Sequence, residues 1–126
     1  MSSAEDIRSH KDLKVWQRGI DLAEAIYKLT AGLPSEEKYG LTSQLRRAAA
    51  SVPANIAEGN ARDSTKDYLR FLSMAVGSLA EVETFLALVE RLRYSSSSSL
   101  RELDALIEEE RRMLRALQKS LRAKLN

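Results

Sequence analysis

Apolar side chains recur at steps of three and four residues along four stretches of the chain, about 13–31, 39–59, 65–93 and 100–125. This spacing places them on one face of an α-helix. The connections between the stretches are short. Four amphipathic helices must bury their apolar stripes against one another, so the pattern predicts an all-α fold, an up-down-up-down antiparallel four-helix bundle.

Each stretch has its own expected buried stripe. The first is Leu13, Trp16, Ile20, Ala23, Tyr27 and Thr30. The second is Leu41, Leu45, Ala48, Ala49, Val52 and Ile56. The third is Tyr68, Leu72, Ala75, Leu79, Val82, Leu86 and Val89. The fourth is Leu100, Leu103, Ile107, Glu110, Leu114, Leu117 and Leu121. The width of the third stripe favours a bundle helix over a two-stranded coiled coil.

The polar start of the chain predicts a flexible N-terminal tail over residues 1–11, followed by a single bundle domain over residues 12–126. Three helix starts carry candidate caps. Asp12 is expected to cap the first helix, Ser64 with Asp67 the third, and Ser98 or Ser99 the fourth.

The second stretch contains a proline and a row of polar side chains. Pro53 lacks an N–H, so the carbonyl of Ala49 loses its usual partner, and we expect a kink or a local opening there. The polar row is Gln44, Arg47, Ser51, Asn55 and Glu58. We interpret this row as a specific contact surface, either between helices or between subunits.

Glu110 occupies a position where the fourth stripe calls for an apolar side chain. One interpretation is that the helix is rotated slightly and the glutamate is exposed. The other is a buried or interfacial glutamate that pairs with an arginine and fixes the register or the subunit arrangement.

Composition narrows the class of protein. The chain has 126 residues, 44% of them hydrophobic and 30% charged, with five glycines, two prolines and no cysteine. These values favour a helical domain and exclude disulfides and thiolate chemistry. No signal peptide and no uninterrupted apolar run of about 20 residues is evident, so a cytoplasmic protein without a membrane segment is expected.

Catalytic motifs are not found in the sequence. The one histidine, His10, falls in the expected tail, and no Glu-x-x-His pair or glycine-rich phosphate loop occurs. We therefore expect no enzyme activity, metal, cofactor or small-molecule substrate. An enzyme would have to use Arg47, Asn55 and Glu58, the only candidates for a buried polar cluster.

Basic side chains form two groups, although the formal net charge is only +2. The first group is Arg46, Arg47, Arg62, Lys66 and Arg70. The second is Arg111, Arg112, Arg115, Lys119, Arg122 and Lys124. They form either a solvated surface paired with nearby carboxylates or a surface that contacts the phosphates of RNA or DNA.

Several blocks of this sequence together resemble a known bacterial family. They are LKVWQ at 13–17, IYKLT at 26–30, YGLTSQLRRAA at 39–49, SVPANIAEG at 51–59, YLRFL at 68–72 and GSLAEVET at 77–84. They are similar to the four-helix-bundle proteins known as 23S rRNA intervening-sequence proteins or S23-type ribosomal proteins. The resemblance covers about residues 13–94.

This resemblance implies an up-and-down bundle that assembles into a ring, a homopentamer. The family is also similar to the accessory proteins of diversity-generating retroelements, which are pentameric, basic and bind nucleic acid. The leading hypothesis is therefore a non-enzymatic oligomer that binds structured RNA or DNA through basic patches repeated around a ring. The alternative is a protein-interaction or scaffold module without a nucleic-acid role.

Overall fold

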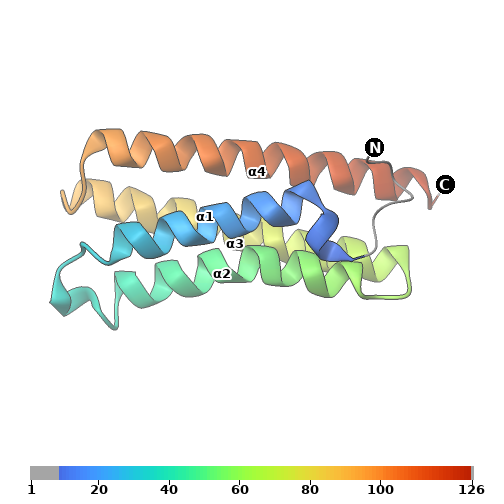
Figure 1. The fold of residues 1–126 in the computed structure, drawn as a ribbon, viewed down its shortest axis with the longest axis horizontal. Helices are drawn as coiled ribbons and strands as arrows, with labels where there is room; N and C mark the ends of the chain where they lie inside the picture. Colours follow the sequence, from blue (N-terminus) through green and yellow to red (C-terminus); the bar gives the residue numbers. More distant parts are fainter. Residues whose placement is uncertain (1–8, 126) are drawn as a thin grey trace.

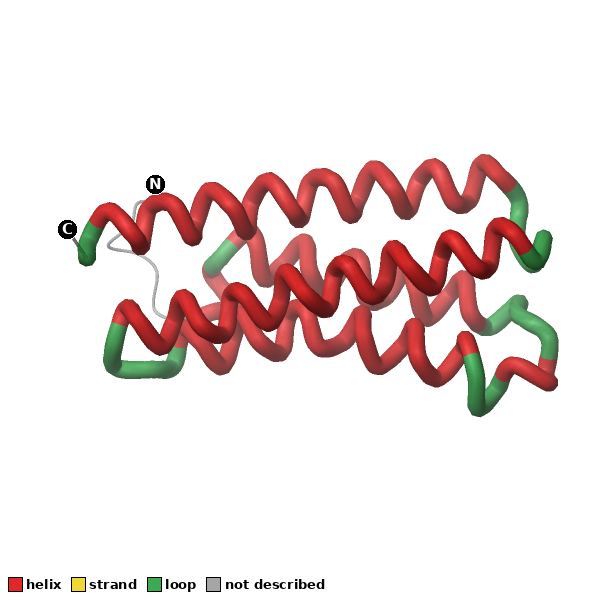
Figure 2. Tube along the Cα trace, turned by 180° about the vertical axis from the view of Figure 1, so that it is seen from behind, coloured by secondary structure: helices red, strands yellow, loops and turns green. Residues whose placement is uncertain are grey.

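Four long helices run alternately up and down in the computed structural model, which describes residues 9–125 (Figure 1). They are α1 (Lys14–Thr30), α2 (Leu41–Asn60), α3 (Thr65–Arg91) and α4 (Ser97–Ala123). Two short 3-10 turns, η2 (His10–Asp12) and η3 (Ser35–Glu37), precede α1 and α2. Figure 2 shows helices joined by short loops, and the predicted all-α bundle is confirmed.

The core lies along the axis of the bundle, and α2 packs most extensively against α3 and next against α1. The stripe predicted for α3 is buried from Leu72 to Val89, with Tyr68 half-buried at its start. The stripe of α4 is also confirmed, except that Gln118 rather than Leu117 is fully buried. The six apolar positions predicted for α2 are buried as well. The helical period was thus sufficient to orient three of the four helices.

The predicted stripe of α1 is wrong by a rotation of the helix. Ile20 and Tyr27 are 42% and 46% exposed, whereas the buried face is Val15, Gly19, Leu22, Ile26 and Thr30. The small Gly19 faces α2: a Cβ atom at this position would lie 3.3 Å from Cβ of Pro53. The buried face carries its own apolar side chains at helical spacing, Val15, Leu22 and Ile26, and it differs from the predicted stripe in placing Gly19 against α2.

The helix starts differ in part from the expected caps. Asp12 does not cap α1, whose first turn has no side-chain cap. Asp12 instead closes the preceding turn with Ser9, whose hydroxyl accepts a hydrogen bond from N–H of Lys11. Helix α4 starts earlier than predicted, and Ser96 is its cap. Residues 1–8 of the expected tail lie outside the described part of the chain.

The expected cap at Ser64 is present, because its hydroxyl accepts a hydrogen bond of 3.0 Å from N–H of Asp67. At Pro53 the chain stays helical from Leu41 to Asn60, so α2 does not open there, and the alternative of a kink stays a prediction. The ring of His10, a residue of the expected tail, packs edge-on against Trp16 with ring centres 5.1 Å apart.

Glu110 lies in the core with 0% of its surface exposed. The interpretation that placed it in solvent is wrong. The other interpretation is correct about burial but not about the partner, because neither carboxyl oxygen has a hydrogen-bond or ion-pair partner among the described residues. The helical period had placed position 110 on the inner face correctly.

Helix α3 is more apolar than expected. Among the described helices it alone is long and apolar enough, by length and composition, to cross a membrane, although the core helix of a bundle passes the same test. Its outer side carries an exposed stripe at steps of three and four residues. The stripe is Met74, Gly77, Glu81, Thr84, Leu88 and Leu92.

Gly59, at the end of α2, lies in close contact with the first turns of α3. A Cβ atom on Gly59 would lie 2.9 Å from Cβ of Phe71 and 3.2 Å from the carbonyl oxygen of Tyr68, whereas one on Gly77 would meet nothing within 4 Å. We expect G59A to lower the free energy of unfolding by about 1–2 kcal/mol, because overpacking outweighs the gain in helix propensity. The matched variant G77A should raise it by about 0.5–1 kcal/mol. Urea denaturation measures the free energy of unfolding of both variants. Equal changes in the two variants would contradict the close packing at Gly59.

Candidate nucleic-acid interface

The first basic group is divided by the fold. Arg46 lies near the start of α2, and its Nε donates a hydrogen bond of 2.8 Å to Oγ1 of Thr30. Its guanidinium also stacks 4.7 Å from the ring centre of Tyr27. Both partners belong to α1, so Arg46 joins two helices. Arg62 lies 16 residues further on, beyond the end of α2 at Asn60.

The predicted polar row of α2 forms mostly local hydrogen bonds. Arg47 donates to the side chain of Gln44, and Nδ2 of Asn55 donates to the carbonyl of Ser51 at 2.8 Å. Glu58 pairs with Arg62. The polar row therefore follows one side of α2, and Arg47, Asn55 and Glu58 do not converge on a common point.

Ser51 is the member of the polar row that reaches a second helix. Its hydroxyl donates to the carbonyl of Ala48 at 2.7 Å and makes a hydrogen bond of 2.6 Å with the hydroxyl of Ser78 on α3. Both serines are largely enclosed where α2 and α3 meet. The prediction of a contact between helices thus applies to Ser51.

The remaining members of the first group surround the turn between α2 and α3. The guanidinium groups of Arg62 and Arg70 lie 4.7 and 4.6 Å from the ring centre of Phe71. Arg62 is also 2.8 Å from Glu58, and Arg70 is 3.6 Å from Asp67. These exposed pairs reduce the positive charge of the turn. Lys66 is exposed and makes no ion pair with another described residue.

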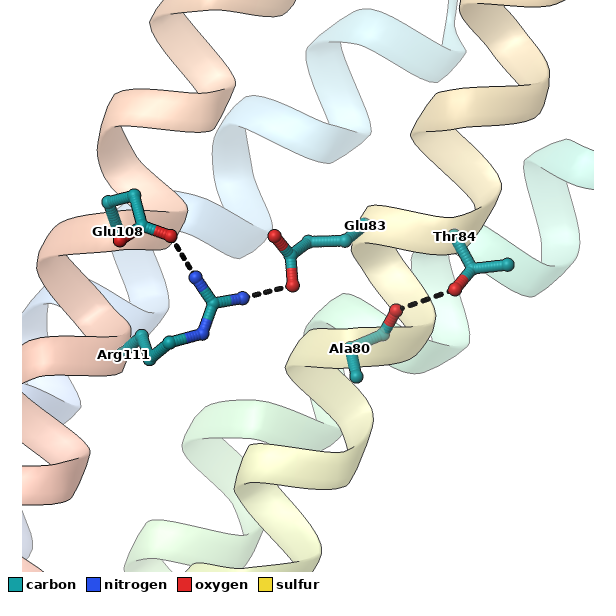
Figure 3. Close-up of polar contacts among 5 residues, drawn as sticks. All are labelled: Ala80, Glu83, Thr84, Glu108 and Arg111. Atoms are coloured by element: carbon teal, nitrogen blue, oxygen red, sulfur yellow. Dashed lines mark hydrogen bonds and ion pairs between the residues drawn. The ribbon is translucent and has the colours of Figure 1, made fainter.

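The second group begins at Arg111, which is the one member held by carboxylates from two helices. Figure 3 shows its guanidinium between Glu108 of α4 and Glu83 of α3, and both ion pairs are present. On the same turn of α3, the hydroxyl of Thr84 donates to the carbonyl of Ala80 at 2.9 Å (Figure 3). Arg111 therefore ties α4 to α3.

Beyond Arg111 the basic side chains face solvent. Residues 111–125 contain six basic side chains and no acidic one. Arg112, Arg115, Lys119 and Arg122 follow steps of three and four residues and are all exposed. Within the described range these four make no ion pair; Arg115 donates to Oε1 of Gln118 at 3.1 Å. We call these four residues the α4 basic stripe.

The fold brings the α4 basic stripe and the α2–α3 turn to the same end of the bundle. In Figure 1 the last turns of α4 and the loop between α2 and α3 both lie on the right, with the start of α1. Figure 2 shows the same end from behind. Groups about 50 residues apart in sequence thus lie at the same end of the bundle.

Two tyrosines have altered acidity. Burial raises the pKa of Tyr68 near the basic end, although its hydrogen bond with Asn60 partly offsets this. At the opposite end, the hydroxyl of Tyr94 donates to Glu37 at 3.1 Å, and this hydrogen bond raises the pKa of Tyr94. Within the described residues, no group of three or more histidine, aspartate or glutamate side chains is placed to hold a metal ion.

A groove of about 330 Å³ runs between α1 and α4 at the end of the bundle away from the basic stripe. It is lined by Ala25, Lys28, Leu29, Ser99, Glu102, Leu103 and Leu106. None of the three residues considered for an enzyme lies in it. The groove therefore gives those residues no shared site.

The contact of Arg46 with α1 predicts a structural role for this residue. We expect R46A to lower the free energy of unfolding by about 1–2 kcal/mol, because it removes a hydrogen bond and a stacked cation. R47A is the matched control, because Arg47 is exposed and bonded only to Gln44, and it should cost less than about 0.5 kcal/mol. Urea denaturation of both variants is the measurement. Equal losses would show that the contact with Tyr27 and Thr30 does not stabilise the fold.

Comparison with known proteins places the chain in a family. The model of the 23S rRNA-intervening sequence protein family matches residues 11–116. A crystal structure from Bacteroides thetaiotaomicron, described as a protein of unknown function from the S23 ribosomal protein family, superposes with a TM-score of 0.78 and 25% identity. That match covers 83% of this chain and 98% of the other. No curated protein matches the chain. The chain belongs to the 23S rRNA-intervening sequence protein family.

Proposed function

We propose that this protein is a non-enzymatic oligomer that binds structured RNA or DNA through its basic end. The observation that carries the proposal is the α4 basic stripe, four exposed cations without a carboxylate partner in the described chain. Phosphate backbones bind such surfaces by releasing condensed counterions. The α2–α3 turn, with Lys66 and the stacked arginines, extends the same region.

The family's description supports a setting near RNA, since it names an intervening sequence of 23S rRNA. The relative from Bacteroides thetaiotaomicron is assigned to a family named for a ribosomal protein, and its own function is unknown. Neither description names a reaction. Together with the basic end, these names favour a nucleic-acid ligand over a small-molecule substrate.

We further propose that the chain assembles into a ring, with five subunits as the favoured number. The outer stripe of α3 supports this, because three of its six members, Met74, Leu88 and Leu92, are large apolar side chains on a surface that the described chain does not cover. Met74 and Leu88 on this stripe are 47% and 45% exposed. A ring would repeat the basic end around an axis, so that several weak phosphate contacts act together.

A scaffold without a nucleic-acid role is the second candidate. The observation that favours it is the pairing of the turn cations, since Arg62 and Arg70 already have Glu58 and Asp67 as partners. The outer stripe of α3 would then be the functional surface, with the cations serving solubility. Salt dependence distinguishes the two candidates, because phosphate binding weakens steeply with salt.

Charge reversal at the α4 basic stripe tests nucleic-acid binding. We expect the triple variant R112E/K119E/R122E to lose most affinity for a structured RNA at low salt. The slope of log K against log salt should fall by about one for each phosphate contact removed. Filter binding at several salt concentrations measures both quantities.

The matched control is R91E/R93E/R101E, which makes the same change of charge at the other end of the bundle. It should keep nearly the wild-type affinity and slope. Equal losses in the two variants would mean that net charge alone matters. No affinity of the wild-type protein at low salt would leave the scaffold as the function.

The outer stripe of α3 predicts where the subunits meet. Light scattering should give the wild-type protein about five times its chain mass of 14.1 kDa. The double variant M74D/L88D should reduce the measured mass to that of one chain, because two buried carboxylates are costly in an apolar interface. L125D, at an exposed leucine near the end of α4, is the control and should keep the wild-type mass. A monomeric wild-type protein would contradict the ring.

A further inference from the structure

Glu110 is a buried carboxyl group for which the proposed function has no use. Its side chain is fully enclosed, and neither Oε1 nor Oε2 lies within hydrogen-bonding distance of a donor in the described part of the chain. An ionised carboxylate in such a place has lost its water and gained no partner, which strongly favours the protonated form. Glu110 is therefore expected to be a neutral carboxylic acid inside an apolar core.

The position of the carboxyl group is fixed by a contact among three helices. A Cβ atom on Gly19 of α1 would lie 2.9 Å from Oε2 of Glu110 and 3.3 Å from Cβ of Pro53 on α2. The absence of a side chain at Gly19 thus makes room for the carboxyl group of α4. The group sits where a small displacement of α1 or α4 would change its surroundings.

The two carboxylates that act on Glu110 are Glu109 of α4 and Asp21 of α1, and both contact one arginine at the line where α1 and α4 meet, here called the seam. Arg18 of α1 places Nε 3.4 Å from Oε1 of Glu109, and its Nη1 is 3.1 Å from Oδ2 of Asp21. Helix α2 presents the uncharged Pro53. On α3 the carboxylate of Glu83 is paired with Arg111, the residue that follows Glu110. Arg18 is therefore the cation that contacts both Glu109 and Asp21.

Arg18 is itself incompletely paired. Its Nε is buried and makes no hydrogen bond, because the contact with Glu109 is an ion pair without hydrogen-bond geometry. Nε of Arg18 is thus a buried donor without an acceptor, and the carboxyl group of Glu110 is a buried acceptor without a donor. Both groups belong to the seam between α1 and α4. Burial, followed by repulsion from Glu109 and Asp21, raises the pKa of Glu110 to about 8.

We propose that Glu110 and Arg18 form a proton-controlled switch between α1 and α4. While Glu110 holds its proton, the guanidinium of Arg18 stays with Glu109 and Asp21. When the proton leaves to solvent, the guanidinium exchanges Glu109 for the newly charged Glu110, and the seam shifts to bring the two groups together. No other reactant is needed.

The switch predicts a pH dependence with a definite sign. The pKa of Glu110 is higher in the folded chain than its ordinary value of 4.5, so the folded chain holds a proton that the unfolded chain has lost. The stabilising contribution is complete below about pH 4.5, falls as the pH rises to about 8, and is constant above that. Relative to E110Q, the unfolding equilibrium constant should rise by up to tenfold per pH unit in this interval.

Nuclear magnetic resonance of the full-length wild-type protein tests the switch directly. The ¹³C carboxyl signal of Glu110 should titrate at a pH well above the signals of exposed glutamates. The ¹⁵Nε signal of Arg18 should move with the same midpoint, because the guanidinium changes partner at that step. The proposal would be overturned if the ¹⁵Nε signal of Arg18 did not change at this midpoint, or if the carboxyl signal of Glu110 titrated below pH 5.

Two variants separate the switch from a merely structural glutamate. R18A should raise the midpoint of Glu110, because the anion loses its incoming partner. E109Q, one residue away and nearly isosteric, should lower that midpoint, because it removes a repelling carboxylate. An unchanged midpoint in R18A would contradict the exchange. The wild-type titration decides the question even where E110Q does not fold.

Discussion

The close approach of α2 to its neighbours is the constraint on which the other features depend. The buried face of α2 includes Ala48, Ala49, Pro53 and Gly59, whose side chains are small or compact. Such a face lets neighbouring backbones come close, so packing contacts are made over a short distance. At one point α2 meets Gly19 of α1, and at its end it meets α3 through Gly59.

At its contact with α2, helix α1 is rotated relative to the stripe predicted for it. Turning Gly19 inward allows contact with Pro53, but the same rotation leaves Ile20 and Tyr27 partly exposed. Arg46 then covers part of the exposed ring by stacking on Tyr27. A cation expected at a phosphate surface is therefore used to hold two helices together, and the aromatic ring is partly shielded from water.

The sequence predicted the features that depend on local periodicity and missed those that depend on neighbours across helices. The number of helices, the inner face of α3 and the cap at Ser64 all follow from residues within a few positions of one another. The pairing of Arg111 joins residues 28 apart, and periodicity says nothing about which carboxylate will be near.

Glu110 shows a different kind of failure. The pattern placed it inside, but the general rule that glutamates face water favoured the wrong alternative. The rule applies to ionised carboxylates, whereas a protonated carboxyl group can be buried at a lower cost in free energy. Burial between packed helices, followed by repulsion from Glu109 and from Asp21 of α1, favours the protonated form, and the linear sequence does not show that α1 and α4 meet at this point.

The α4 basic stripe is not explained by the stability of its own helix. Cations at a helix C-terminus interact favourably with the helix dipole, but that effect is confined to about the last turn. Arg112 and Arg115 lie two to three turns before the end of α4 at Ala123. Like charges three and four residues apart repel each other, so the stripe costs α4 a few tenths of a kcal/mol per pair. A phosphate backbone would relieve this repulsion by supplying counter-charges along the same spacing, which is the physical reason for preferring a nucleic-acid ligand.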